Sequence, residues 1–190
     1  MTSALSQFSV MRMPREILFG EGQMSAIGQV AARHGFKALI CTDARFAAGE
    51  AFSKLCQHLQ RAGVNYNVFD AVEPDVPCEN VYQCVEQARA FSPDLVIGVG
   101  GRSCLDLAKC ASLILTHGGR LEDYYGEFKV PSKVLPVVAV PTTAGTGSEV
   151  TPVAVVSDSN RTLKVGISSP FMIPIAAICD PVLTGRARRN

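Results

Sequence analysis

The sequence predicts an α/β fold in which a parallel, twisted sheet carries helices on both of its faces. Three observations lead to this fold class. Short apolar runs of strand length alternate with amphipathic stretches of helical period along the 190-residue chain. Two of the runs, Lys37–Thr42 and Leu95–Val99, are apolar almost throughout, as strands buried on both faces of a parallel sheet are. Glycines separate many of the elements, which favours successive βαβ units.

The first half of the chain begins with a short strand pair and then alternates helix and strand. The helix that opens the alternation has Met24, Ile27 and Ala31 on one face and ends before Gly35. The predicted order is strands Phe8–Met13 and Ile17–Phe19, helix Gln23–His34, strand Lys37–Thr42, a helix through Phe52–Leu59, strand Val64–Phe69 and a helix through Val81–Ala88.

The second half continues the alternation and then adds short strands. Leu107, Ala111 and Ile114 mark a helix that Gly118 and Gly119 close. The remaining predicted elements are strands Leu95–Val99, Val134–Val140, Val153–Ser157, Leu163–Ile167 and Ala176–Cys179, with a turn at Asp158–Asn160. We expect residues 1–184 to form one domain and the basic residues 185–190 to form a disordered tail.

Composition excludes several classes of protein. The formal net charge is +1, which gives no electrostatic reason to expect nucleic acid or an anionic membrane as a partner. No apolar run reaches the roughly 18 residues of a membrane span. The seven cysteines include no C-x-x-C pair and lie mostly in apolar stretches. We therefore expect reduced thiols in a cytoplasmic protein, with a zinc site as the weaker alternative.

A glycine turn after the strand Leu95–Val99 is the strongest functional signal. Gly100 and Gly101 let the backbone turn sharply into the next helix, whose free N–H groups favour a phosphate. Ser103 suits a helix cap or a phosphate contact. The alternative is an ordinary glycine-rich turn with a serine cap. The run is not a G-x-G-x-x-G, because Ser103 stands where its last glycine would be.

Two further signals follow other strands. The segment Pro141–Thr151 places hydroxyls and glycines directly after a buried strand, so it can present both N–H and O–H donors to an anion; the alternative is a polar surface loop. Asp43 follows the strand Lys37–Thr42 and can accept hydrogen bonds from ribose hydroxyls. The alternative for Asp43 is a helix N-cap. Ligands of parallel α/β sheets bind beyond the carboxyl ends of the strands, where all three signals lie.

These motifs together carry a resemblance to the iron-dependent alcohol dehydrogenase family, which is related to dehydroquinate synthase. The segments that carry it are G-G-x-S-x-x-D-x-A-K from Gly100, P-T-T-A-G-T-G-S-E-V-T from Pro141, P-R-E-I-L-F-G-E-G from Pro14 and A-A-I-C-D-P-V-L-T from Ala176. The resemblance implies an N-terminal Rossmann-like domain, which we expect this chain to form, and an all-helical C-terminal domain, which we expect to be absent here.

The resemblance also implies a cofactor and the residues that bind it. The cofactor is NAD, with NADP possible, and Asp43 near the adenosine ribose favours NAD. Gly100, Gly101, Ser103 and Asp106 would line the pyrophosphate and nicotinamide region. The residues that would complete the site are Thr142, Thr143, Thr146 and Ser148 from the facing loop, Lys164 near the nicotinamide ribose and Leu183 near the adenine edge.

Two departures from the family pattern bear on activity. Arg102 stands where the family has a third glycine, so it either clashes or adopts a disfavoured φ, or else swings outward to pair with a phosphate; we expect weakened NAD binding. The family's divalent metal, iron or zinc, is held by one Asp and three His of the helical domain. His34, His58 and His117 match none of these ligands, so no metal ligand and no catalytic residue is assigned to this chain.

The resemblance therefore implies the nucleotide-binding half of an oxidoreductase that interconverts a small alcohol and an aldehyde or ketone by hydride transfer. We expect this chain alone to have negligible activity, since a metal would polarise the substrate. The alternatives are a truncated gene product, a non-catalytic NAD(P)-binding module and a scaffold that binds no nucleotide. Without a helical half, an uncovered apolar face is expected to cause homo-oligomerisation or poor solubility.

Overall fold

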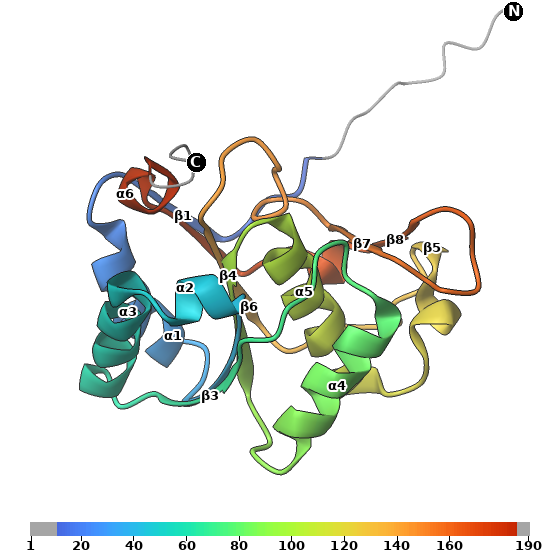
Figure 1. The fold of residues 1–190 in the computed structure, drawn as a ribbon, viewed down its shortest axis with the longest axis horizontal. Helices are drawn as coiled ribbons and strands as arrows, with labels where there is room; N and C mark the ends of the chain where they lie inside the picture. Colours follow the sequence, from blue (N-terminus) through green and yellow to red (C-terminus); the bar gives the residue numbers. More distant parts are fainter. Residues whose placement is uncertain (1–10, 186–190) are drawn as a thin grey trace, which may run out of the picture.

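The computed structural model describes residues 11–185, and its main feature is a six-stranded parallel sheet (Figure 1). The spatial order of the strands is β1-β9-β6-β4-β2-β3. Their bounds are β1 Glu16–Phe19, β2 Lys37–Cys41, β3 Asn65–Phe69, β4 Leu95–Gly100, β6 Val137–Pro141 and β9 Ala176–Cys179. Each neighbouring pair is parallel, which confirms the predicted fold class.

Helices cover both faces of this sheet, as the sequence predicted (Figure 1). The helices α4 (Cys78–Arg89) and α5 (Arg102–His117) pack on one face, where Leu39 and Cys41 of β2 point. The helices α1 (Ile27–Ala32) and α3 (Glu50–Arg61), with the 3₁₀ turn η1 (Gln23–Ala26), pack on the other face against Ala38 and Ile40. Successive β2 side chains thus enter different cores, which explains why the strand is apolar almost throughout.

A smaller sheet of three strands lies beyond α5 (Figure 1). Its strands are β5 (Gly126–Glu127), β7 (Val153–Val156) and β8 (Val165–Ser168), in the order β5-β8-β7. The strands β7 and β8 pair antiparallel around the predicted turn, and Ala154, Val156 and Ile167 are buried in the α4–α5 core. The sequence did not predict β5, which is only two residues long.

Short helical elements connect these layers. The bounds are α2 Ala44–Ala47, α6 Pro181–Thr184, η2 Leu121–Tyr124 and η3 Pro170–Met172. Only the N-cap alternative for Asp43 anticipated α2, since four residues are too few to show a helical period of their own. Among residues 11–185, no helix is both long enough and apolar enough to cross a membrane.

The start of the described chain differs from the prediction. Residues 11–13 are not a strand, and residues 8–10 of the expected element lie outside the described range. The strand β1 pairs instead with β9, and just before it the Arg15 amide donates to Ile175 O, 3.0 Å away. Pro14 has no N–H with which to extend this ladder. The division into a domain of residues 1–184 and a tail of residues 185–190 stays a prediction, because only Gly185 of the tail is described.

Candidate functional site

A cavity of about 570 Å³ opens at the carboxyl edge of the sheet. Asp43 after β2, Thr142 and Thr143 after β6, and Asp180 after β9 all line it. The other lining residues come from the segments around η1, α2, α3 and α6: Gly22, Met24, Ser25, Arg45, Phe46, Gly49, Glu50, Ala51, Lys54, His58, Val182 and Leu183. The volume falls in the range of ligand pockets, roughly 300–1,000 Å³. The cavity also lies where the topology of the sheet predicts a ligand.

The glycine turn lets α5 begin close to the sheet. A Cβ on Gly100 would lie 2.5 Å from the Cys104 sulfur, and the φ of Gly100 is 142°. Both facts require glycine at this position. A Cβ on Gly101 would instead point toward the facing loop, 3.5 Å from Thr143 Oγ1. The Thr142 amide donates to Gly100 O at 2.9 Å, so the two turns are held side by side next to the cavity.

Arg102, which replaces the third glycine of the family pattern, causes no backbone strain. It is the first residue of α5, and its φ is not in the left-handed region. Its Nε lies 3.3 Å from Asp106 Oδ2, and the side chain is 56% exposed. The expectation of a disfavoured φ is therefore wrong, because a helix start accommodates any L-residue. The effect of Arg102 on NAD binding stays a prediction.

Asp43 caps α2, as the alternative for this residue anticipated. Its Oδ1 accepts from the Phe46 amide at 3.0 Å. The other oxygen, Oδ2, lies 3.9 Å from Cys104 Sγ. Burial, together with the charge of Asp43, raises the pKa of the Cys104 thiol to about 12. The cap leaves Oδ2 able to accept a further hydrogen bond at the cavity, so the predicted ribose contact is compatible with the cap and stays a prediction.

Asp180 is a site residue that sequence analysis did not select. Its side chain is almost fully buried, with Oδ1 accepting from the Val182 amide at 3.1 Å and Oδ2 from the Met24 amide at 3.0 Å. It therefore fixes both α6, which carries the predicted residue Leu183, and η1 at the cavity wall. The signal was an Asp directly before Pro181, which is a helix-start pattern.

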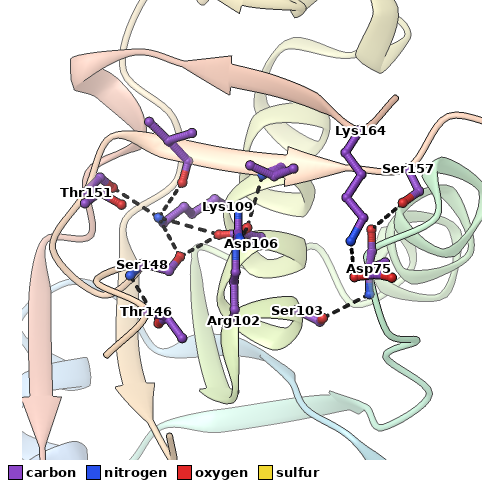
Figure 2. Close-up of polar contacts among 12 residues, drawn as sticks. Asp75, Arg102, Ser103, Asp106, Lys109, Thr146, Ser148, Thr151, Ser157 and Lys164 are labelled. Atoms are coloured by element: carbon purple, nitrogen blue, oxygen red, sulfur yellow. Dashed lines mark hydrogen bonds and ion pairs between the residues drawn. The ribbon is translucent and has the colours of Figure 1, made fainter. Parts of the chain in front are cut away.

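Two predicted residues, Ser103 and Lys164, are tied to the segment before α4 and do not line the cavity (Figure 2). Ser103 Oγ accepts from the Asp75 amide at 3.1 Å, and the Lys164 ammonium forms an ion pair with the Asp75 carboxylate. Ser157 Oγ also donates to Asp75 O at 2.9 Å. The cofactor roles of Ser103 and Lys164 stay predictions.

Asp106 and Ser148 are brought together, but in the interior. Their exposed fractions are 2% and 4%, and Ser148 Oγ donates to Asp106 Oδ1 at 2.5 Å. Lys109, which sequence analysis quoted only within a motif, donates to Ser148 Oγ at 2.9 Å (Figure 2). Thr146 is exposed and accepts from the Ser148 amide at 3.4 Å. The side chains of Asp106 and Ser148 therefore bond to each other in the interior and do not line the cavity.

The donor set fits a dinucleotide and does not fit a metal ion. The hydroxyls of Thr142 and Thr143 at the cavity, and the amino end of the 16-residue helix α5 beside Thr143, suit a phosphate-bearing ligand. Among residues 11–185, no three His, Cys, Asp or Glu side chains gather as metal ligands would. We derive no metal-dependent step from these residues.

The chain matches known proteins over nearly all of its length. The NAD-dependent methanol dehydrogenase of Bacillus methanolicus is 35% identical over 175 residues, which are 90% of this chain and 45% of that protein. The crystal structure of a 1,3-propanediol oxidoreductase has a TM-score of 0.90 and 33% identity, covering 93% of this chain and 47% of that one.

A sulfoacetaldehyde reductase from Bifidobacterium kashiwanohense, solved in complex with NAD⁺, has a TM-score of 0.78 and 31% identity, covering 94% of this chain and 47% of that one. The chain thus spans about half the length of these relatives. The family model described as "Iron-containing alcohol dehydrogenase" matches residues 14–181. The resemblance seen in the motifs is confirmed, and the chain belongs to the iron-containing alcohol dehydrogenase family.

Proposed function

We propose that this chain is the nucleotide-binding half of an NAD(P)-dependent oxidoreductase that interconverts small alcohols and aldehydes or ketones by hydride transfer. The observation that carries the proposal is the cavity at the carboxyl edge of the sheet, where Asp43, Thr142 and Thr143 meet beside the glycine turn. The relative from Bifidobacterium kashiwanohense was solved with NAD⁺ bound, which supports the same ligand here.

Each part of the cavity takes one part of the cofactor in this proposal. The Asp43 carboxylate accepts hydrogen bonds from the adenosine ribose, and its charge repels the 2′-phosphate of NADP, which favours NAD. The amino end of α5 at Gly101 and the hydroxyls of Thr142 and Thr143 face the pyrophosphate. Leu183 contributes apolar surface near the adenine.

At the nicotinamide end, the cofactor and the residues of this chain have different roles. NAD supplies hydride chemistry when it is bound, and this chain's residues bind and orient it. Ser103 and Lys164 would reach the nicotinamide half from their positions around Asp75. The described residues do not gather a metal-ligand set, so we expect the chain alone to have negligible turnover. That same observation favours a second candidate, a non-catalytic NAD(P)-binding module, which alcohol turnover by the pure chain would exclude.

Two wider properties also stay proposals. Self-association is supported by the apolar side chains on the edge strand β1, where Phe19 is 78% exposed and Ile17 is 44% exposed. A cytoplasmic location is supported by the seven cysteines, all of which are free thiols.

The proposed function is tested by titrating NAD and NADP into the wild type, Gly101→Ala and Gly166→Ala, with the dissociation constant from calorimetry as the readout. A Cβ on Gly101 occupies the space that the pyrophosphate would approach, so we expect NAD binding to weaken at least tenfold. Gly166 is the matched control, because a Cβ there meets no atom closer than Val153 Cγ1 at 4.0 Å and lies in the second sheet. A wild type that binds neither nucleotide, or equal affinities for all three proteins, would contradict the proposal.

A further inference from the structure

A lysine ammonium is completely enclosed at the centre of α5. Lys109 has an exposed fraction of 0%, and its Nζ donates to Ser148 Oγ at 2.9 Å, Thr151 O at 3.1 Å and Val153 O at 2.9 Å. An unpaired buried charge is costly, so an enclosed lysine persists only where its donors are matched. Three acceptors match the three N–H groups of the ammonium.

Every one of these acceptors lies between Ser148 and Val153, directly after the loop of residues 142–147 that carries the cavity-lining threonines. Asp106, one turn earlier on α5, binds the same segment: its Oδ1 accepts from Ser148 Oγ at 2.5 Å and its Oδ2 from the Val155 amide at 3.1 Å. Figure 2 shows these contacts converging on α5 from the loop and from β7. One face of one helix thus holds the chain from Ser148 to Val155.

The loop that carries Thr142 and Thr143 is anchored at both ends as a result. At its start, Pro141 is in register with Gly100, and the Thr142 amide donates to Gly100 O. At its end, Ser148 bonds to Lys109 and Asp106. Between these anchors, residues 144–146 are exposed. The first anchor fixes Thr142, and the second limits the positions that the rest of the loop, from Thr143 onward, can take.

We propose that Lys109, Asp106 and Ser148 are positioning residues that hold the 142–147 loop in the conformation that receives the dinucleotide, acting through the loop and not by touching the cofactor. This inference rests on the proposed function. It reassigns Asp106 and Ser148, whose polar atoms are already paired in the interior, from cofactor contacts to supports of the loop. It also gives Lys109 a role that its burial alone does not explain.

The test compares the wild type with Lys109→Met, Ser148→Ala and Ser112→Ala. Lys109→Met keeps the length of the side chain and removes its donors, and Ser148→Ala removes the shared hydroxyl while leaving the lysine its two carbonyl acceptors. Ser112 is the matched control, because it is a fully buried serine on α5 whose Oγ donates at 2.6 Å to Leu135 O, remote from the loop. NAD dissociation constants, melting temperatures and amide exchange are measured for each protein.

We expect Lys109→Met and Ser148→Ala each to weaken NAD binding at least tenfold and to speed amide exchange at Val150 and Val155 at least tenfold. Because both changes remove the same anchor, the double variant should bind NAD as tightly as whichever single variant has the lower affinity. Ser112→Ala should lower the melting temperature and leave NAD affinity within twofold of wild type. This split separates positioning from general stability.

Other outcomes overturn the inference. Unchanged exchange at Val150 and Val155 in Lys109→Met would show that the lysine does not hold the loop. Faster exchange with unchanged NAD affinity would show that the loop conformation does not matter for binding. Fully additive losses in the double variant would indicate that Ser148 touches the cofactor by itself. A wild type that binds no NAD would contradict the proposed function instead, and the exchange measurements would still decide whether the anchor exists.

Discussion

The motif Gly100 to Lys109 forms two different regions of α5. One is the amino end of the helix at the cavity, and the other is the inner face that packs against the chain after Ser148. At its amino end the helix lies beside the cavity: a Cβ on Gly101 would come within 3.5 Å of the hydroxyl of Thr143, which lines the cavity. On its inner face the helix encloses Asp106 and Lys109, whose polar atoms bond to Ser148 and the chain after it. Groups left available suit a ligand, whereas groups already paired suit a support.

This contrast predicts that substitutions on the inner face of α5 lower the free energy of unfolding more than substitutions on its solvent side. Asp106→Ala removes the carboxylate beside the Lys109 ammonium, 3.9 Å from Nζ, and leaves the Val155 amide without its acceptor. Breaking one partner of a buried ion pair costs about 3–5 kcal/mol. We expect the free energy of unfolding in urea to fall by that amount.

Arg102→Ala is the control for Asp106→Ala, because Arg102 contacts the same carboxylate from the solvent side with 56% of its side chain exposed. Exposed ion pairs contribute about 0–1 kcal/mol, so this variant should remain close to wild type. Equal losses in the two variants would mean that the carboxylate does not compensate the enclosed lysine, and the contrast between the two sides of α5 would fail.

Lys109 sharpens the comparison through its pH dependence. Desolvation lowers its pKa from 10.5 to about 8, although the nearby charge of Asp106 and, less strongly, Cys110 and Glu149 oppose this and Arg102 adds to it. Between these two values the unfolded chain holds a proton that the folded chain has lost. Stability contributed by this group therefore rises with pH across that window, by about 1.4 kcal/mol per unit.

The measurement is the difference in unfolding free energy between wild type and Lys109→Met at pH 8 and pH 9.5. We expect the stability of the wild type relative to Lys109→Met to be greater at pH 9.5 than at pH 8. The buried thiols, whose pKa values are raised by burial, destabilise both proteins at alkaline pH and cancel in the difference. A difference that is flat, or that moves the other way, would show that Lys109 is not held in the desolvated position.

Sequence patterns predicted the main sheet because each of its strands leaves a local signal. The β2 and β4 strands are buried on both faces, so their residues are apolar without alternation, and a glycine turn follows β4, where α5 begins. The pairing of β1 left no such signal, because Ile17 and Phe19 are partly exposed residues of an edge strand and resemble those of a hairpin. Its pairing with β9, more than 150 residues away, depends on tertiary structure.

The site was predictable only in part, for a related reason. Residues directly after strands, such as Asp43, Thr142 and Thr143, were identified because the topology alone brings strand ends together. The enclosure of Asp106 and Ser148 depends on how a loop folds back on α5 over some 40 residues of sequence, which no local pattern encodes. The same holds for Asp180, whose partner Met24 lies at the other end of the chain.

The smallest expected effect concerns Arg102, the residue that departs from the family's glycine pattern. Its helical backbone gains nothing from glycine, and its guanidinium reaches Asp106, so Arg102→Gly should change NAD affinity by less than about threefold while costing up to about 1 kcal/mol of stability at a helix position. Calorimetric titration and urea unfolding of the two proteins measure both quantities. A tenfold or greater gain in affinity on introducing glycine would instead place the arginine side chain in the path of the phosphates, which is one of the alternatives that the sequence left open. In that case Arg102, and not only the glycine turn before it, would belong to the part of α5 that faces the ligand.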